Sequence, residues 1–293
     1  MRATANWFSV RLGPSRELSL MALGYRDRGV DCLKAGDHEQ ALLHATKVIR
    51  LHRAAPEGYG LRAHVCRFNG QTGQGIVDAT ECIRLCSRDD FWVLADAFWC
   101  RAELLVSRKD WAAAVADATE AIRLTGSFTF LARRRGWAYR TRGNARLGQD
   151  NFAAAISDFS EAFGLDPRDA YSLRQRAYCH FRRGDWDQAI RDCTEAIRLH
   201  PAHAAWCCAT RAAAHLNKGE LDEAISSCTD AIRRGLECAQ AYSNRGEAHR
   251  RKGDYAAAAA DFNHALQLDP GDAETRDRME LLRSLVGQRT GSQ

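Results

Sequence analysis

Lysine is nearly missing from this sequence. Of the 42 basic residues only five are lysines, and the other 37 are arginines. The lysines are Lys34, Lys47, Lys109, Lys218 and Lys252. A GC-rich genome is the simpler explanation of this bias. The functional explanation is recognition of carboxylates or phosphates, which the guanidinium binds in a bidentate manner. The formal net charge of +5 over 293 residues is too small to indicate nucleic-acid binding by itself.

Long hydrophobic stretches are also missing. No run approaches the roughly 20 apolar residues that span a bilayer, so we expect no membrane insertion. Residues 1–20 have neither the apolar core nor the cleavage site of a secretory signal. Arg2, Arg11 and Arg16 precede the first acidic residue, Glu17, which only faintly resembles an organellar transit peptide. With eleven cysteines and no secretory signal, the simpler expectation is a cytoplasmic protein with free, buried thiols.

Catalytic motifs are missing as well. The sequence contains no glycine-rich phosphate loop, no nucleophile elbow and no paired His-Glu zinc motif. His200, His203, Cys207 and Cys208 lie close together in the sequence. The two adjacent cysteines would point about 100° apart on a helix, which disfavours a zinc site. We therefore predict no enzymatic activity, no cofactor and no metal.

An internal repeat is what the sequence does contain. One pattern recurs as AVADATEAIRL at 114–124, AIRDCTEAIRL at 189–199 and AISSCTDAIRR at 224–234. Aligning the chain on these segments gives seven units of 34 residues: 22–55, 56–89, 95–128, 136–169, 170–203, 205–238 and 239–272. Insertions at 90–94, 129–135 and 204 interrupt the series. A fixed period of this length is typical of stacked helical hairpins.

Small residues recur at fixed positions of the units. Positions 8 and 20 are glycine or alanine in all seven units, which allows two helices to approach closely. Five units carry a glycine at position 15: Gly36, Gly70, Gly184, Gly219 and Gly253. A glycine there can adopt a positive φ and end the first helix. Each unit is therefore predicted to form a helix, a tight turn and a second helix.

This pattern resembles the tetratricopeptide repeat family over about residues 22–272. The resemblance implies an all-α fold, a right-handed superhelical solenoid of seven helix-turn-helix repeats. Residues 1–21 are expected to form an N-terminal arm and a backward extension of the first helix. Residues 273–293 are expected to form a C-terminal capping helix and tail, because the last unit cannot bury its apolar face alone.

Position 7 departs from the leucine that is usual in the family. It is arginine in all seven units: Arg28, Arg62, Arg101, Arg142, Arg176, Arg211 and Arg245. Position 23 is aspartate in five units: Asp78, Asp117, Asp158, Asp192 and Asp261. We predict that these two columns form a partly buried ladder of ion pairs between helices.

The family resemblance implies that positions 2, 5, 6, 9, 12 and 13 of each first helix face a concave groove. The candidate peptide-binding residues at these positions are Trp99, Trp137, Arg140, Asn144, Tyr171, Arg174, Tyr178, Phe181, Arg182 and Trp206. Tryptophan, tyrosine and arginine are the residue types that dominate binding hot spots. The alternative interpretation is that the aromatic residues are ordinary helix-packing core.

The function favoured by this pattern is an adaptor or scaffold that binds an acidic and apolar peptide segment of another protein. The carboxylate clamp of some family members is disfavoured, because Trp206 and Thr210 stand where the clamp needs Lys and Arg. One alternative is RNA binding along an arginine-rich superhelix, and another is a non-catalytic accessory subunit of a larger complex. The sequence leaves the partner and the oligomeric state open.

Overall fold

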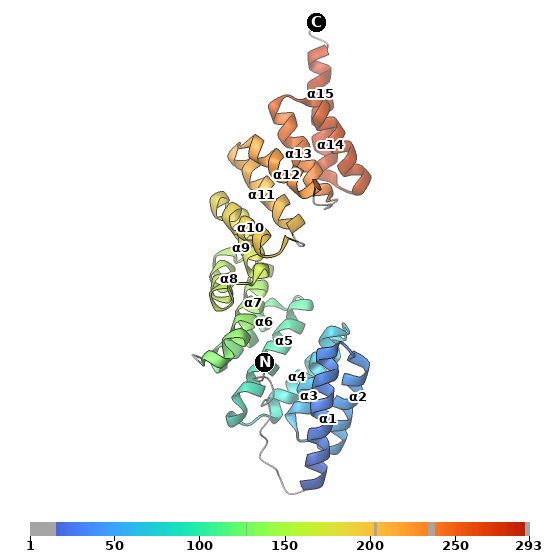
Figure 1. The fold of residues 1–293 in the computed structure, drawn as a ribbon, viewed down its shortest axis with the longest axis vertical. Coiled ribbons are helices and arrows are strands. Elements are labelled where there is room, and N and C mark those ends of the chain that lie inside the picture. Colours follow the sequence, from blue (N-terminus) through green and yellow to red (C-terminus); the bar gives the residue numbers. More distant parts are fainter. Residues whose placement is uncertain (1–15, 127, 202–203, 234–237, 291–293) are drawn as a thin grey trace. The chain divides into compact units, whose positions relative to one another are not determined.

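The computed structural model describes residues 16–126, 128–201, 204–233 and 238–290, and residues 1–15 of the predicted arm lie outside this part (Figure 1). The described ranges contain fifteen α-helices and two short 3-10 helices and no strand, which confirms the all-α prediction. The chain divides into two compact units, an N-terminal unit of residues 1–149 and a C-terminal unit of residues 150–293. The number and borders of the seven repeats stay a prediction.

The N-terminal unit consists of paired antiparallel helices. Its α-helices are α1 (Arg16–Ala35), α2 (His38–Leu51), α3 (Pro56–Phe68), α4 (Thr72–Leu85), α5 (Phe91–Ser107), α6 (Trp111–Thr125) and α7 (Ala132–Gly148). The 3-10 helices η1 (Arg88–Asp90) and η2 (Thr129–Leu131) lie before α5 and α7. Each odd-numbered helix from α1 to α5 packs against the helix that follows it, and α3 and α5 also contact each other.

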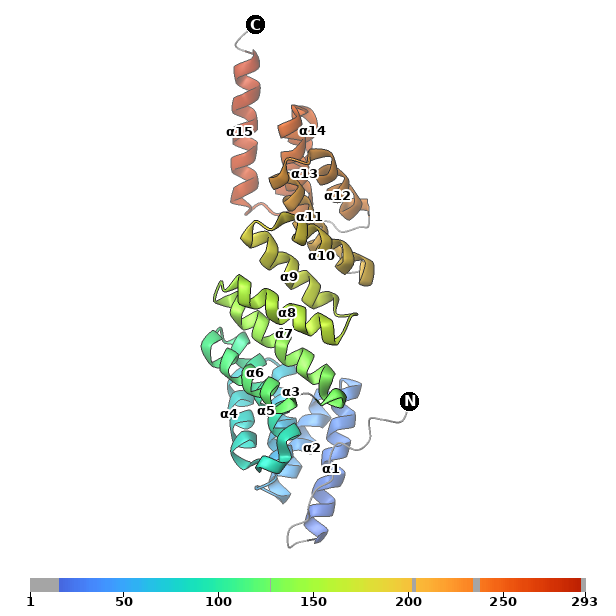
Figure 2. The same cartoon turned by 90° about the vertical axis from the view of Figure 1, so that its left-hand side faces the viewer.

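The C-terminal unit continues the same construction. Its helices are α8 (Phe152–Leu165), α9 (Ala170–Arg183), α10 (Trp186–Leu199), α11 (Ala204–Lys218), α12 (Leu221–Arg233), α13 (Ala239–Lys252), α14 (Tyr255–Leu268) and α15 (Ala273–Thr290). Within this unit the hairpins α9–α10, α11–α12 and α13–α14 are stacked one after another (Figure 2). The last helix, α15, packs on α14 and confirms the predicted capping helix.

The turns inside the hairpins take the backbone conformation that position 15 predicts. The five glycines at this position all have positive φ, between 69° and 84°. In the two units without a glycine, Lys109 and Asp150 occupy the same position with φ of 61° and 55°. The turn therefore imposes a left-handed conformation even where the residue has a Cβ that disfavours it.

Close helix approach explains the columns of small residues. A Cβ added to Gly246 of α13 would lie 2.8 Å from the Phe262 ring of α14. One added to Gly75 of α4 would lie 2.9 Å from Leu104 of α5. Ala114 and Ala258, at position 20, are fully buried. These contacts leave no room for a larger side chain, as the sequence pattern predicts.

Ion pairs join the two helices of several hairpins, as predicted for positions 7 and 23. The Nε and Nη2 atoms of each arginine donate to the two carboxylate oxygens of the aspartate sixteen residues later. The pairs are Arg62–Asp78, Arg101–Asp117, Arg176–Asp192 and Arg245–Asp261, with distances of 2.6–2.9 Å. The third nitrogen, Nη1, reaches a hydroxyl of the preceding hairpin in three of them: Arg101 to Thr80, Arg176 to Ser160 and Arg245 to Thr229, at 3.0–3.3 Å. Each of these three arginines therefore fastens its own hairpin and the one before it.

Candidate peptide-binding surfaces

The ten predicted groove residues lie on the first helices of successive hairpins. Trp99 is on α5, and Trp137, Arg140 and Asn144 are on α7. Five more, Tyr171, Arg174, Tyr178, Phe181 and Arg182, are on α9, and Trp206 is on α11. The first four belong to the N-terminal unit and the other six to the C-terminal unit. We call the two sets the N-terminal surface and the C-terminal surface and describe each by itself.

On the N-terminal surface, two tryptophans pack against each other. The ring centroids of Trp99 and Trp137 are 5.1 Å apart. Trp99 is only 8% exposed, and its indole N–H donates to the Thr141 hydroxyl at 3.0 Å. Trp137 is half-buried, and the Arg133 guanidinium lies 5.4 Å from its ring. Trp99 therefore packs under Trp137, and Trp137 is the more exposed of the two rings.

Arg140 and Asn144 follow Trp137 along α7. Both side chains are half-buried. They lie one and two turns beyond Trp137, so the three residues share one face of the helix.

A charged network beside the tryptophans was not anticipated from the sequence. His64 Nε2 of α3 lies 2.7 Å from Asp96 Oδ2 of α5, and Arg134 Nη1 of α7 lies 3.0 Å from Asp96 Oδ1. Burial by itself lowers the pKa of His64, but Cys100 and the Asp96 carboxylate outweigh it and raise that pKa to about 10. Burial raises the pKa of Asp96, but His64 and Arg134 lower it to about 2. A charged imidazolium and a carboxylate thus hold three neighbouring helices together.

The same face carries a second polar group. Glu103 accepts a hydrogen bond from the Thr141 hydroxyl and lies 3.9 Å from Arg67 Nη1. The Arg67 guanidinium in turn lies 5.2 Å from the Trp99 ring. A cavity of about 10 Å³ beside Asp96 and Arg134 has room for one water molecule. Glu103 and Thr141 therefore pair directly, whereas the Nε atom of Arg67 is buried without a hydrogen-bond partner.

Two different signals could have found this network. His64 and Asp96 occupy positions 9 and 2 of successive units, and both are predicted groove positions. A histidine and an aspartate at such positions of adjacent units are a sequence signal for a charged pair between their first helices. Arg134 lies in the insertion 129–135, outside the 34-residue frame, so no column could reveal it.

On the C-terminal surface, an arginine lies between two aromatic rings. The Arg174 guanidinium is 5.0 Å from the Tyr171 ring and 5.7 Å from the Trp206 ring. Tyr178 extends the group, with its ring 5.7 Å from that of Trp206. The Nε atom of Arg174 is buried without a hydrogen-bond partner, and no carboxylate of the described residues pairs with this guanidinium. The structure therefore brings Tyr171, Arg174, Tyr178 and Trp206 together.

Phe181 and Arg182 are drawn towards the neighbouring turn and helix. The Phe181 ring packs edge-on against Trp186 of α10 at 5.2 Å. Arg182 Nη1 donates to the Tyr178 hydroxyl at 2.8 Å, and its guanidinium lies 4.8 Å from the Phe152 ring of α8. These two residues border the four-residue group, and the hydrogen bond from Arg182 fixes the position of the Tyr178 hydroxyl.

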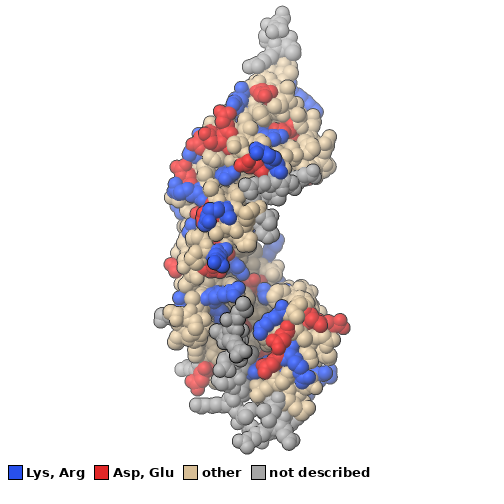
Figure 3. Space-filling view, viewed as in Figure 1, with Lys and Arg blue, Asp and Glu red and all other residues tan. Residues whose placement is uncertain are grey.

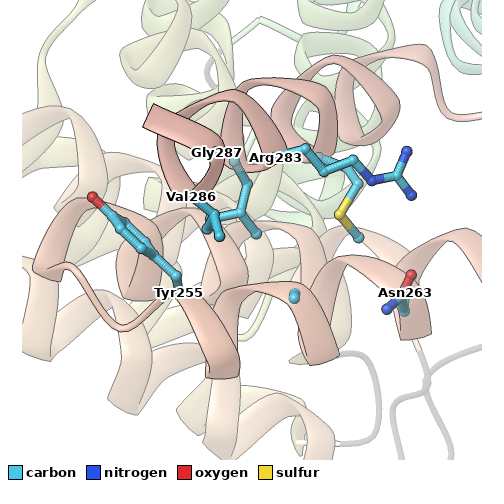
Figure 4. A pocket seen from close by; sticks show the side chains of 8 residues that line it. Tyr255, Asn263, Arg283, Val286 and Gly287 are labelled. Atoms are coloured by element: carbon cyan, nitrogen blue, oxygen red, sulfur yellow. The ribbon is translucent and has the colours of Figure 1, made fainter. Parts of the chain in front are cut away.

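A separate cleft of about 450 Å³ lies between α14 and α15 (Figure 4). Its lining is mostly apolar, with Ala259, Met279, Leu282 and Val286, and its polar lining includes Asn263 and Arg283. It contains no acid–base pair and was not predicted from the sequence. The sequence signal is the spacing of Leu282 and Val286, which places both on one face of α15.

Among the described residues, no group of three His, Cys, Asp or Glu side chains is arranged to hold a metal ion. No helix in the described ranges is both long and apolar enough to cross a membrane. All eleven cysteines are free thiols.

Comparison with known proteins identifies the repeat. Residues 140–204 and 210–273 match the family model described as tetratricopeptide repeat. No sequence matches in the comparison with curated proteins. Stacked helical hairpins of this size, fastened by small-residue columns, define a helical repeat protein.

Solved structures resemble the chain over most of its length. A tetratricopeptide repeat protein from Parabacteroides merdae is 17% identical, with 90% of this chain and 99% of that chain covered and a TM-score of 0.58. A chain of the APC/C hetero-tetramer Cut9–Hcn1 is 15% identical to this chain. The match covers 88% of this chain and 48% of that chain, with a TM-score of 0.65. YrrB is 16% identical, with 67% of this chain and 95% of that chain covered and a TM-score of 0.55. Identities this low establish the fold alone, and the family match identifies the repeats within residues 140–204 and 210–273 as tetratricopeptide repeats.

Proposed function

We propose that this protein is a scaffold that binds a peptide segment of another protein, with the C-terminal surface as its main contact. The observation that carries the proposal is Arg174, an arginine held between the Tyr171 and Trp206 rings without an acidic partner. Other arginines of the unit, such as Arg176 and Arg245, are fully engaged with aspartates. Arg174 is therefore a guanidinium, placed between two aromatic rings, that is available to a ligand.

The chemistry of this group defines the segment that it fits. A guanidinium binds a carboxylate with two parallel hydrogen bonds, and the flanking rings strengthen that contact by excluding water. The Tyr171, Tyr178 and Trp206 rings offer apolar contact area at low entropic cost. The expected ligand is an extended or helical segment in which an acidic residue neighbours an apolar one.

The N-terminal surface is proposed as a second contact. Trp137 supplies an accessible ring, and Arg140 and Asn144 lie on the same face of α7. The Trp99 side chain supports this contact from below. Because the His64–Asp96–Arg134 network fixes α3, α5 and α7, the surface is already ordered before a ligand binds, which lowers the entropic cost of binding.

The similar structures support a binding role. YrrB is described as a tetratricopeptide repeat protein with an unusual peptide-binding site, and Cut9 occurs in a hetero-tetramer with Hcn1. We propose a non-catalytic role for this chain on the same ground, since its surfaces present contact groups rather than an acid–base pair or nucleophile. The free state of all eleven cysteines supports the cytoplasm as its compartment.

The test is a comparison of captured partners. The wild type, a Trp137→Ala/Tyr171→Ala/Trp206→Ala variant and an Arg174→Ala variant are immobilised, and the bound proteins are identified by mass spectrometry. Arg198→Ala, which removes a fully exposed arginine of α10, is the matched control. Proteins retained by the wild type and the control, and lost from both other variants, are the partners.

An unchanged set of proteins on the triple variant contradicts the proposal. Circular dichroism of each variant shows whether the helices remain, which separates loss of binding from loss of folding. Acidic-apolar synthetic peptides from the partners should then bind the wild type at least tenfold more tightly than the Arg174→Ala variant.

RNA binding is the weaker candidate. On the face shown in Figure 3, basic and acidic side chains lie interspersed and form no broad basic field. Four arginines of the ladder are also paired with aspartates. A steep fall of affinity with salt and retention on single-stranded RNA would favour RNA. Co-purification of a second chain in fixed stoichiometry would favour an accessory subunit.

A further inference from the structure

Three phenylalanines of the N-terminal unit form a line of contacting rings at its surface. Phe91 begins α5, Phe128 precedes η2, and Phe130 lies within η2. The centroid distances are 5.4 Å from Phe91 to Phe128 and 5.7 Å from Phe128 to Phe130. Phe128 is 47% exposed and Phe130 is 73% exposed. We call these three rings the aromatic stripe.

Repeat packing does not account for the stripe. Phe91 and Phe130 belong to the insertions 90–94 and 129–135, outside the 34-residue units. The adjacent Leu131 is buried and anchors this segment to the core, whereas the Phe130 ring points away from it. A contiguous exposed aromatic patch on a folded protein is typical of an interaction surface.

Opposite charges flank the two ends of the stripe. Asp89 precedes Phe91 by two residues, and Arg133 follows Phe130 by three residues in the first turn of α7, with its guanidinium 5.4 Å from the Trp137 ring. Their neighbours are already engaged, since Asp90 accepts hydrogen bonds from Ser87 and Arg135 donates to the Gly126 carbonyl. Asp89 and Arg133 are both exposed, and neither pairs with an opposite charge among the described residues. The stripe is therefore acidic at one end and basic at the other.

We propose that the aromatic stripe is the contact surface of a homodimer, in which a second copy of this chain binds through the same stripe. A two-fold axis near Phe128 pairs Phe91 of one copy with Phe130 of the other. The same operation places Asp89 against the partner's Arg133, so the charged ends are complementary only in this antiparallel arrangement. A partner of one uniform charge would match only one end.

The area of the stripe sets the strength of this contact. A stable dimer buries about 800 Å² on each copy, and three partly exposed rings offer less than that. The dimer is therefore weak and reversible, with a dissociation constant of roughly 10 µM to 1 mM. The aromatic rings supply most of the free energy, as in other small contact patches.

Sedimentation equilibrium of the full chain from about 10 µM to 1 mM tests the proposal. The weight-average mass of the wild type should rise from 32.7 kDa towards twice that value. Phe130→Ser should keep the monomer mass over the same range. Phe68→Ser, which removes another half-exposed phenylalanine of the same unit outside the stripe, should behave as the wild type. A wild type that stays monomeric at 1 mM, or a Phe130→Ser variant that associates as the wild type does, overturns the proposal.

Charge reversal tests the two-fold arrangement. Asp89→Arg and Arg133→Asp each place like charges opposite one another, so each variant alone should dimerise at least fivefold more weakly. The double variant Asp89→Arg/Arg133→Asp should regain wild-type association, and an equimolar mixture of the two single variants should form the mixed dimer. Failure of either restoration overturns the antiparallel pairing, because this pairing predicts rescue in both experiments.

Discussion

At the scale of single residues, three of the arginines at position 7, Arg101, Arg176 and Arg245, each connect three helices with one side chain. Arg176 donates two hydrogen bonds of 2.7 Å to Asp192 on α10 and one of 3.0 Å to Ser160 on α8. The Asp192 carboxylate is buried, so removal of its partner leaves a charge without compensation. The pair therefore specifies how the helices dock and is costly to break.

Arg176→Leu is predicted to destabilise the protein by about 3 kcal/mol, because Asp192 then remains buried and unpaired. Arg198→Leu, which breaks an exposed pair with Glu195 on the next turn, should leave the unfolding free energy nearly unchanged. Chemical denaturation of the two variants and the wild type measures both effects. Equal stability of the Arg176→Leu variant and the wild type would contradict the structural role of the ladder.

The His64–Asp96 pair predicts a dependence of stability on pH. The pKa of His64 is about 10 in the folded protein and near 6.5 when the chain unfolds. Its stabilising contribution is therefore fully present below pH 6.5 and is lost as the pH rises through 10. The pKa of Asp96, about 2, acts in the opposite direction, and its contribution is lost only as the pH falls from about 4 to 2.

Unfolding free energies of the wild type and a His64→Gln variant at pH 6, 8 and 10 measure this contribution. The difference between the two proteins should be largest at pH 6 and shrink steadily towards pH 10. A difference that is constant over this range would show that folding does not raise the pKa of His64.

At the scale of secondary-structure elements, the turn between the helices of a hairpin demands a left-handed residue. Lys109 adopts φ of 61° and Gly253 φ of 84° at equivalent positions. A Cβ in this region costs roughly 1–2 kcal/mol, and glycine avoids that cost but loses more chain entropy on folding. The demand comes from the hairpin geometry, since it persists whichever residue occupies the position.

Reciprocal substitutions at these two turns should change stability in opposite directions. Lys109→Gly is predicted to raise the free energy of unfolding by up to about 1 kcal/mol, and Gly253→Lys to lower it by about 1 kcal/mol. Both positions are exposed, and a Cβ at Gly253 would meet no atom within 4 Å, so packing does not confound the comparison. Thermal unfolding followed by the far-ultraviolet circular dichroism of the helices gives the sign of each change. Shifts of the same sign would mean that the turn geometry is not the cause.

At the scale of the whole molecule, an array of hairpins needs a cover for its last apolar face. Met279 and Leu282 of α15 are buried against Phe262 of α14, and the Thr275 hydroxyl lies 2.5 Å from that of Ser243 on α13. Without α15 the Phe262 side of α14 would meet water. The capping helix is therefore part of the folded structure of the C-terminal unit.

Truncation after Asp272 is predicted to lower the melting temperature and to promote aggregation, because it removes two buried side chains worth roughly 1.5–3 kcal/mol each. Leu281→Ser, at an exposed position of α15, should have little effect. Differential scanning calorimetry and light scattering compare the two variants with the wild type. A truncated chain with the melting temperature of the wild type would show that α15 does not contribute to the stability of the C-terminal unit.

The 34-residue repeat of the sequence was sufficient to predict the helices, the hairpin turns and the arginine–aspartate pairs. These features follow from side-chain volume and charge at positions that recur in every unit, so each unit repeats the information of its neighbours. Only the tertiary structure decided which aromatic rings are accessible: Trp99 and Trp137 both occupy predicted groove positions, yet one is covered by Thr141, His64 and Arg67 and the other is not. It also brought Arg134 to Asp96 and lined up the phenylalanines of two insertions. The physical reason is that burial depends on what an adjacent hairpin places over a side chain, and insertions fall outside the periodic register that makes the rest predictable.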